Sequence, residues 1–321
     1  SIILISILLP LLAISQGCNL NSTEPSYSDT THFVIKLQHD IPWPTLGQTA
    51  WPKALHDAQC TGRSSFSGPA NGSVKTTILL GAFQTDPVMG QDSVFYIVAD
   101  SSLLAYSLNG TLIWKSYIGV FAGGAMNYSP PMIIGNGIIL VGTNNGISAF
   151  NKNGTILWQT QLNGGVLLKS CAIGLDGNIY TISSAGTLYA INQSGNIIWQ
   201  RNAPVGYFIW GEMTTICFSP DGSRFYVGGS TSEQSLYVLN TNGDILRSDS
   251  IGGRQLGAIS VDVDGNVYSY FDQDLVSISL TGIVRWRIPG AGSNWNVVID
   301  PNGNIAYLSK GKLILVDNDG K

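Results

Sequence analysis

The hydrophobic and polar positions of this chain form one pattern that recurs along most of its length. Two short apolar runs flank a polar turn, and the second run ends on a tryptophan four residues after the turn glycine, as in the stretch Gly186–Trp199. Such a pair of runs around a glycine turn predicts two antiparallel β-strands joined as a hairpin. The other copies are Leu103–Trp114, Gly146–Trp158, Leu275–Trp286 and two incomplete ones, Leu236–Arg247 and Leu313–Gly320.

The turn glycines of these copies lie 38 to 48 residues apart. A period of about forty residues built from short strands is typical of a β-propeller blade. We therefore predict an all-β fold, a single β-propeller of four-stranded antiparallel blades, in which the glycine turn joins the third strand to the fourth. Upstream pairs such as Asp264-Gly265 supply the positive φ angles that a tight first hairpin needs. The turn glycines are Gly110, Gly154, Gly195, Gly243, Gly282 and Gly320.

The last copy, residues 293–321, has room for three strands only. An isolated apolar run at residues 74–80 precedes the first blade, and we predict that it supplies the missing fourth strand. Pairing of this run with the last blade would close the ring and leave no sheet edge unpaired at the join. The predicted ring then has six blades, or seven or eight if the chain is a fragment.

The recurring tryptophans have a structural explanation. A tryptophan on the outer strand can cover the end of the neighbouring blade and bury roughly 150–250 Å². Its glycine partner allows the close approach of the next turn. We interpret four residues as such staples and assign them no ligand: Trp114, Trp158, Trp199 and Trp286.

The N-terminal part of the chain differs from the repeats. Residues 1–14 are almost wholly apolar, and the small residues Ser15 and Gly17 fit a secretory cleavage site before Cys18. The apolar run is shorter than the roughly 20 residues that a membrane span needs. We predict a signal-like segment at residues 1–17, with membrane contact only through this segment if it is retained, and a secreted or cell-surface location. Residues 18–50 are polar and are predicted to form a linker or arm.

Residues 51–62 contain a Trp-Pro pair, then His-Asp, and then Thr-Gly. This spacing resembles the lead-in of secreted proteins with pyrroloquinoline-quinone-like (PQQ-like) propeller repeats, and the glycine–tryptophan turns resemble the blades of the same family. The resemblance implies a lead-in at residues 51–73 that packs on a propeller at residues 74–321. Because this family has many non-enzymatic members, we expect the chain to be one of them. The matching residues are Trp51, Pro52, His56, Asp57, Thr61 and Gly62.

The residue types needed for catalysis are scarce. All three histidines precede the blades, which excludes a Ser-His-Asp triad or a histidine metal cluster within them. Quinone-dependent dehydrogenases that resemble this repeat hold a calcium-bound cofactor through carboxylates, and adjacent cysteines are common in them. This chain has three glutamates and no Cys-Cys pair. We therefore expect no catalytic residue, no metal and no cofactor, and we interpret the pair His56-Asp57 as a packing element.

Composition agrees with a packed fold and excludes one class of partner. Of the 321 residues, 44% are hydrophobic and 11% are charged, whereas disorder needs the opposite balance. The net charge is −4, and no basic run is present that could neutralise phosphates. Binding to nucleic acid is therefore not expected.

Four cysteines occur singly along the chain. Cys171 and Cys217 fall in the first strands of neighbouring repeats, so a disulfide between them is conceivable. Two buried free thiols are the equal alternative, because free cysteine is among the most buried residue types. A bond between Cys18 and Cys60 is a weaker possibility.

Several asparagines are candidates for glycosylation because they stand in Asn-x-Ser/Thr sequons. Three of them share the same inter-strand turn of three consecutive blades, which would place sugars along one face and leave the opposite face free for contact. The candidates are Asn21, Asn71, Asn109, Asn153 and Asn192.

Loops that enter the blades should surround the central opening on that opposite face. Aromatic side chains beside a few polar groups are what a peptide or sugar site needs, although the same residues could instead close the channel as core. The candidates for this channel-mouth site are Phe121, Tyr128, Tyr207, Trp210, Glu212, Arg254 and Trp295.

These observations favour a secreted or cell-surface, non-catalytic propeller that serves as a structural or protein-interaction module. A sharper version makes it a subunit of an extracellular assembly or filament that docks through its N-terminal arm, with a protein partner or with other copies of itself. The alternative is a carbohydrate-binding, lectin-like propeller that takes a glycan, and a quinone-dependent oxidoreductase is less favoured.

Overall fold

The structure is a computed structural model of the chain. It describes residues 37–66, 71–81, 85–119, 129–164, 171–183, 185–202, 215–228, 236–292 and 296–321. These ranges contain β-strands and turns, and none of them holds a helix that is long and apolar enough to cross a membrane.

In the described part of the chain the strands form six antiparallel sheets, five with four strands and one with three, and the strands of each sheet lie in chain order. Blade 1 contains β1 (Val88–Met89), β2 (Phe95–Ala99), β3 (Ser102–Tyr106) and β4 (Leu112–Tyr117). Blade 2 contains β5 (Met132–Ile133), β6 (Ile139–Thr143), β7 (Gly146–Phe150) and β8 (Ile156–Gln161). Blade 3 contains β9 (Ala172–Ile173), β10 (Ile179–Ile182), β11 (Thr187–Ile191) and β12 (Ile197–Asn202). Blade 4 contains β13 (Cys217–Phe218), β14 (Arg224–Gly228), β15 (Leu236–Asn240) and β16 (Ile245–Asp249). Blade 5 contains β17 (Ser260–Val261), β18 (Val267–Phe271), β19 (Asp274–Ile278) and β20 (Val284–Ile288), and blade 6 contains β21 (Val298–Ile299), β22 (Ile305–Ser309) and β23 (Lys312–Val316).

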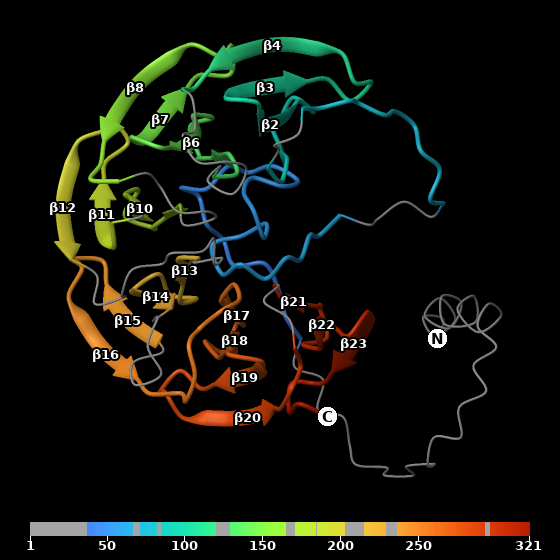
Figure 1. Cartoon of the computed structure of the whole chain (residues 1–321), viewed down its shortest axis with the longest axis vertical. Helices are drawn as coiled ribbons and strands as arrows, with labels where there is room; N and C mark the ends of the chain where they lie inside the picture. The colour runs from blue at the N-terminus through green and yellow to red at the C-terminus, as the bar shows by residue number, and fades with distance from the viewer. Residues whose placement is uncertain are drawn as a thin grey trace, which may run out of the picture. The chain divides into compact units, whose positions relative to one another are not determined.

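The blades follow one another around a ring, with the short first strands towards the centre and β4, β8, β12, β16 and β20 along the rim (Figure 1). Every residue of β7 and of β11 is buried, because blades cover both faces of these third strands. The fourth strands alternate between exposed and half-buried residues, as in β8. The predicted all-β propeller is therefore confirmed.

The turn between the third and fourth strands has the same construction in each complete blade. In blade 2, Gly154 has a φ of 82° and its backbone nitrogen donates a hydrogen bond to the Asn151 carbonyl. The pairing of β7 with β8 shifts register next to the turn, between Ala149 and Phe150. A left-handed glycine beside a bulge is a frequent way to join two strands, and it explains why glycine recurs at this position.

Aromatic side chains fill the space between neighbouring blades. Tyr180 of blade 3 lies with its ring centroid 5.4 Å from Phe218 and 5.2 Å from Phe225, both of blade 4. All three side chains are almost completely buried. Offset and edge-on ring pairs at such distances add to the stabilisation that burial alone provides.

The prediction that residues 74–80 pair with blade 6 and close the ring is wrong. These residues form no strand, and Val74 and Leu79 are exposed at 80% and 96%. The segment packs instead beside blade 1, where a Cβ on Gly110 would lie 2.5 Å from the Thr76 side chain. Side-chain contacts with blade 1 therefore hold the segment, and blade 6 has three strands with β23 at its edge.

Candidate functional site

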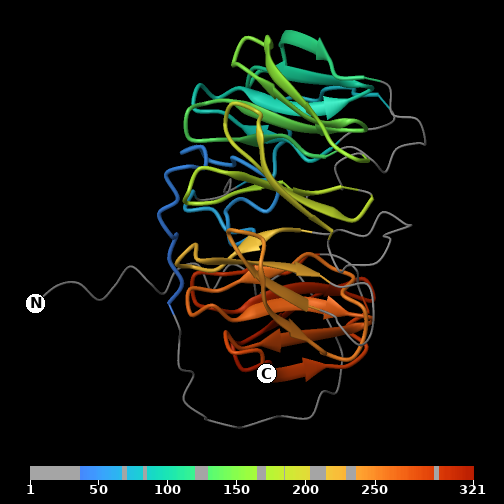
Figure 2. The same cartoon turned by 90° about the vertical axis from the view of Figure 1, so that its left-hand side faces the viewer.

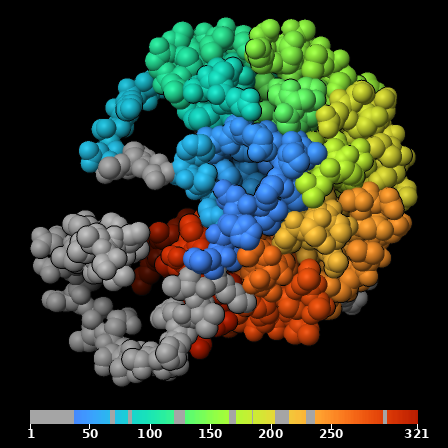
Figure 3. All heavy atoms as spheres, turned by 180° about the vertical axis from the view of Figure 1, so that it is seen from behind, coloured from blue at the N-terminus to red at the C-terminus, as the bar shows by residue number. Residues whose placement is uncertain are grey.

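Residues 37–66, which we call the central plug, hydrogen-bond to the innermost strand of every blade. Figure 3 shows the plug as blue spheres in the middle of the ring, and Figure 2 shows it along one face. The Trp43 indole nitrogen donates to the carbonyl of Ile173 in β9 at 2.7 Å. In the other five blades a plug carbonyl accepts from a backbone nitrogen: Trp51 from Met89, Pro52 from Ile133, Ala58 from Phe218, Gln59 from Val261 and Thr61 from Ile299, at 2.8–3.0 Å.

The conformation of the plug is fixed by its own polar side chains. One carboxylate oxygen of Asp57 accepts the backbone nitrogen of Thr61 at 2.9 Å, and the other accepts the Thr61 hydroxyl. Leu55, His56 and Cys60 adopt positive φ angles of 62°, 72° and 56°. Residues other than glycine occupy this region only when their surroundings hold them there, so the Asp57–Thr61 bonds stabilise a strained loop.

The pair His56-Asp57 lies in this loop. The His56 Nδ1 atom is 3.8 Å from a carboxylate oxygen of Asp57, and the imidazole ring packs against Trp51 at 5.1 Å. Both carboxylate oxygens of Asp57 bond to Thr61, and the His56 ring contacts Trp51, so each member of the pair has contacts within the plug.

Residues 37–50 are part of the plug, and the prediction of a polar linker through residue 50 is wrong for this portion. Trp43 and Leu46 are each only 4% exposed. The Thr45 carbonyl accepts the backbone nitrogen of Gly135, and Leu46 pairs with Ile134 as an isolated β-bridge. These contacts join residues far apart in the chain, which is why no local pattern indicated them.

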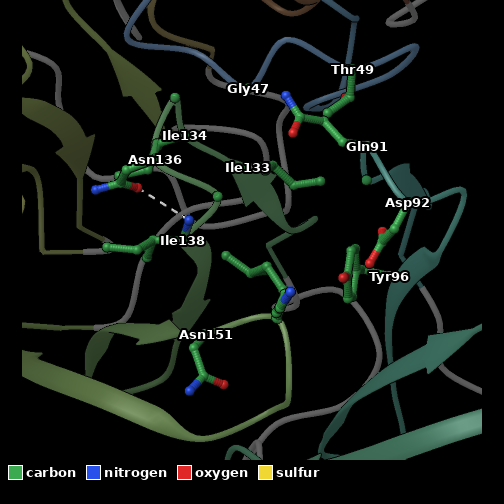
Figure 4. Close-up of a pocket in the computed structure, with 15 residues that line it drawn as sticks. Gly47, Thr49, Gln91, Asp92, Tyr96, Ile133, Ile134, Asn136, Ile138 and Asn151 are labelled. Carbon is green, nitrogen blue, oxygen red and sulfur yellow. Dashed lines mark hydrogen bonds between the residues drawn. The ribbon is translucent and has the colours of Figure 1, made fainter.

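A pocket of about 320 Å³ lies where the plug meets blades 1 and 2 (Figure 4). Its base is apolar and includes Ile133 and Ile138, while polar side chains stand around it. Among them, the buried Thr49 hydroxyl oxygen has no hydrogen-bond partner. The other polar side chains that line the pocket are Gln91, Asp92, Tyr96, Asn136, Asn151 and Lys152.

Tyr96 and Asp92 form one wall of this pocket. A Cβ on Gly90 would lie 2.9 Å from both the Asp92 carboxylate and the Tyr96 ring, so only glycine fits between them. Burial, and to a lesser extent the negative charge of Asp92, raises the pKa of Tyr96 to about 12. The phenol is therefore neutral at physiological pH and able to donate a hydrogen bond.

Most of the predicted channel-mouth residues lie outside the described residues: Phe121, Tyr128, Tyr207, Trp210, Glu212 and Trp295. Arg254 is described, and it is exposed with its Nε atom 3.8 Å from the Asp272 carboxylate. The backbone nitrogen of Arg254 donates to the same carboxylate at 3.1 Å. This arrangement ties the segment before β17 to the turn between β18 and β19.

The four predicted staple tryptophans all lie at blade interfaces. The indole nitrogens donate to a turn carbonyl of the following blade: Trp114 to Lys152, Trp158 to Gln193, Trp199 to Thr241 and Trp286 to Asn318, at 2.8–3.0 Å. A Cβ on the turn glycine of each following blade would lie 2.7–2.9 Å from the ring. In blade 4 Arg247 occupies this position and donates to the Leu280 carbonyl at 2.9 Å.

The described cysteines are all buried free thiols: Cys60, Cys171 and Cys217. The conceivable Cys171–Cys217 bond is therefore not present, and the Cys171 sulfur lies 3.6 Å from the Thr181 hydroxyl. Cys18 lies outside the described residues.

The sequon asparagines differ in exposure. Asn71, Asn109 and Asn153 are exposed, Asn192 is half-buried, and Asn21 lies outside the described residues. The Asn192 side-chain oxygen accepts two backbone nitrogens of its own turn, those of Ser194 and Asn196.

A calcium-bound quinone would need several carboxylates around one point. Within the described ranges no three histidine, cysteine or acidic side chains come close enough together to hold a metal ion. The plug also covers the centre of the ring on the face that Figure 3 shows. The described residues therefore do not fit such a cofactor.

The chain is similar to known proteins in sequence and in fold. The model of the family described as outer membrane protein assembly factor BamB, a PQQ-like repeat family, matches residues 44–205. No curated protein sequence matches the chain. Among solved structures it is similar to a catalytically inactive virginiamycin B lyase from Staphylococcus aureus with quinupristin, with a TM-score of 0.53 and 14% identity over 72% of this chain and 83% of the other. At that identity the similarity shows the fold alone.

Proposed function

Because this chain belongs to the PQQ-like repeat β-propeller family described as outer membrane protein assembly factor BamB, we propose that it is a non-catalytic propeller that binds other proteins. The family description names a factor in protein assembly, which supports an interaction role. The same role is supported by a surface on blade 6.

The observation that carries this proposal is the exposure of β23. The third strands of the other blades are almost wholly buried, and each pairs with a strand on both sides. In contrast, β23 pairs with β22 alone. Leu313 and Leu315 are 74% and 60% exposed, and Leu308 on the same face of β22 is 51% exposed. An apolar strand with a free edge is a template for an added strand.

The rim strands also have a free edge, but four of the five, all except β8, carry charged side chains. Charged side chains such as Lys115 in β4 and Arg287 in β20 stand on them, and charges on an edge oppose the addition of another chain. Apart from Lys312 at its start, β23 is entirely apolar. The partner is therefore an extended segment with apolar side chains, supplied by another protein or by a second copy.

The location outside the cell, and a role as a subunit of an extracellular assembly or filament, are part of the same proposal. The apolar residues 1–17 support secretion, and the exposed sequons Asn109 and Asn153 are compatible with a glycoprotein. The N-terminal arm, residues 18–36, provides a second means of attachment.

Hydrogen exchange and affinity capture test this function together. In the isolated protein we expect rapid exchange at the β23 backbone amides that face away from β22, and slow exchange at the same amides once the captured partner is bound. The double variant Leu313→Lys/Leu315→Lys should lose the partner, whereas the control Leu246→Lys, on the 54%-exposed rim position of β16, should keep it. Slow exchange at the outward-facing amides of β23 in the isolated protein, or a partner that tolerates the double variant, would refute the proposal.

A carbohydrate-binding propeller is the second candidate, and the pocket beside Tyr96 is the feature that favours it. An unpaired Thr49 hydroxyl, amide side chains and an aromatic ring above an apolar base are groups that bind sugars. Loss of glycan binding on Asn136→Ala, with melting unchanged, would support this function. A glycan array that gives no signal with the wild-type protein would exclude it.

A further inference from the structure

Two cysteines from distant parts of the chain meet beneath the central plug. Cys60 belongs to the plug, Cys217 belongs to β13 of blade 4, and both side chains are completely buried in one apolar cluster. The backbone nitrogen of Phe218 donates to the Ala58 carbonyl at 2.9 Å, so the two segments run side by side. The Cys60 sulfur is 3.9 Å from the carbonyl oxygen of Ile216, the residue before Cys217, and the Cys217 thiol donates to the Ile259 carbonyl at 2.8 Å.

A lysine lies against this pair. The side chain of Lys53 is buried, and its Nζ atom donates to the Cys60 sulfur at 3.3 Å and to the Asp57 carbonyl at 3.2 Å. A buried ammonium group is costly unless an anion or several acceptors compensate it. The Cys60 thiolate is the group in contact with Nζ that can provide this charge.

The protonation of the two thiols differs as a result. Burial raises the pKa of Cys60, but the hydrogen bond from Cys217 and the charge of Lys53 outweigh burial, so the pKa is lowered on balance. Burial and the interaction with Cys60 raise the pKa of Cys217 well above its ordinary value. One sulfur is therefore a nucleophile, and its neighbour keeps its proton.

We propose that Cys60 and Cys217 are oxidised to a disulfide that ties the central plug to blade 4. The oxidant is a small-molecule disulfide of the glutathione type. It acts as the plug docks on blade 4, when Lys53 and the two cysteines come together, because both sulfurs are inaccessible once docking is complete. The Cys60 thiolate attacks one sulfur of the oxidant and releases a thiolate. That thiolate takes the proton of Cys217, whose sulfur then attacks the Cys60 sulfur of the mixed disulfide and expels the second thiolate.

The balance of this reaction is one new sulfur–sulfur bond in the protein and one broken in the oxidant. The cysteine pair loses two electrons, and the oxidant is reduced to one thiol, which holds the proton of Cys217, and one thiolate, which carries the charge that Cys60 had. Cys171 is the internal reference, because its sulfur contacts the Thr181 hydroxyl and no other described cysteine.

Refolding of the full chain in a mixture of reduced and oxidised glutathione tests the proposal, and the test does not depend on where the protein is located. After refolding, all remaining thiols are alkylated in denaturant without reductant, and peptides are identified by mass spectrometry. We expect one linked peptide that contains Cys60 and Cys217 and an alkylated Cys171. Alkylation of Cys60 and Cys217, or a link from either to another cysteine, would overturn the proposal.

Melting experiments provide a second measurement on the same preparation. Reductant should lower the melting temperature of the oxidised wild-type protein and of the control variant Cys171→Ser. It should have no effect on Cys60→Ser or Cys217→Ser. An equal shift in Cys217→Ser and in the wild type would contradict the disulfide. Lys53→Met should slow formation of the linked peptide several-fold, because the Cys60 thiolate loses the positive charge beside it. An unchanged rate would show that Lys53 does not assist the oxidation.

Discussion

Replacement of Trp199 measures how strongly one blade holds the next. The indole nitrogen donates to the Thr241 carbonyl at 3.0 Å, and the ring lies 5.9 Å from that of Tyr180. Substitution of a large buried aromatic by alanine costs about 3–5 kcal/mol of unfolding free energy. Because Trp199 is half-buried, we expect Trp199→Ala to lower the unfolding free energy by about 3 kcal/mol, the low end of this range.

Two further variants separate the contribution of the indole hydrogen bond from that of the ring packing against Gly243. Trp199→Phe keeps most of the ring and loses the hydrogen bond, which should cost about 1 kcal/mol. Gly243→Ala places a methyl group 2.9 Å from the Trp199 ring at a residue whose φ is 81°. The left-handed backbone alone costs about 1–2 kcal/mol for a residue with a side chain, and the clash with the ring adds to this.

The double variant Trp199→Ala/Gly243→Ala completes the cycle. The clash disappears when the ring is removed, whereas the backbone strain remains. The loss in the double variant should therefore be smaller than the sum of the two single losses by about 1 kcal/mol. Urea denaturation followed by circular dichroism measures all four proteins. Additive losses, or a cost of Trp199→Ala below about 1 kcal/mol, would refute the packing argument.

Three other predictions concern the plug, the pocket and the turns. Asp57→Ala removes both hydrogen bonds to Thr61 and should destabilise the plug by about 1–3 kcal/mol. We expect faster proteolytic cleavage after residue 50 in this variant and a smaller effect in Thr61→Val. Equal cleavage rates for the wild type and Asp57→Ala would contradict this prediction. The pKa of Tyr96 is raised from 10.0 to about 12, so its contribution to stability is complete below pH 10 and is lost as the pH rises to 12. Tyr96→Phe should flatten that alkaline decline, and an unchanged pH profile would argue against burial of the phenol. Expression in a glycosylating host should add mass at the exposed Asn153, and an intact mass unaffected by deglycosylation would exclude it.

The repeat could be predicted from sequence because it is local. A turn glycine, a bulge and a tryptophan lie within one hairpin, so their spacing is visible in the chain. The run at residues 74–80 also has the composition of a strand, and it does lie where a neighbour of blade 1 is expected, against Gly110. Pairing with β23 also requires the segment's backbone to lie beside the first and last blades at once. The positions of those blades depend on the whole ring, so the sequence of the segment does not determine them.

The plug was only partly predictable, for a related reason. Its residues before Trp51 have no hydrophobic period, and their partners are distant, such as Ile173 for Trp43. The available signal was a duplicated dipeptide, since Trp43-Pro44 repeats the Trp51-Pro52 of the lead-in. Most of the channel-mouth candidates fall outside the described residues, so they remain predictions.

The hydrogen bonds of the plug explain how blade 6 can keep a free edge. A ring that depended on pairing at its join would open wherever that pairing is missing. Here blades 5 and 6 are held from the centre, through the carbonyls of Gln59 and Thr61 on β17 and β21. Arg63 adds a third attachment, because its guanidinium donates to the Ile299 carbonyl and to the His39 carbonyl. The blades are therefore held together whether or not the edge of β23 is paired, and the strand addition that we propose would not require the blades to separate.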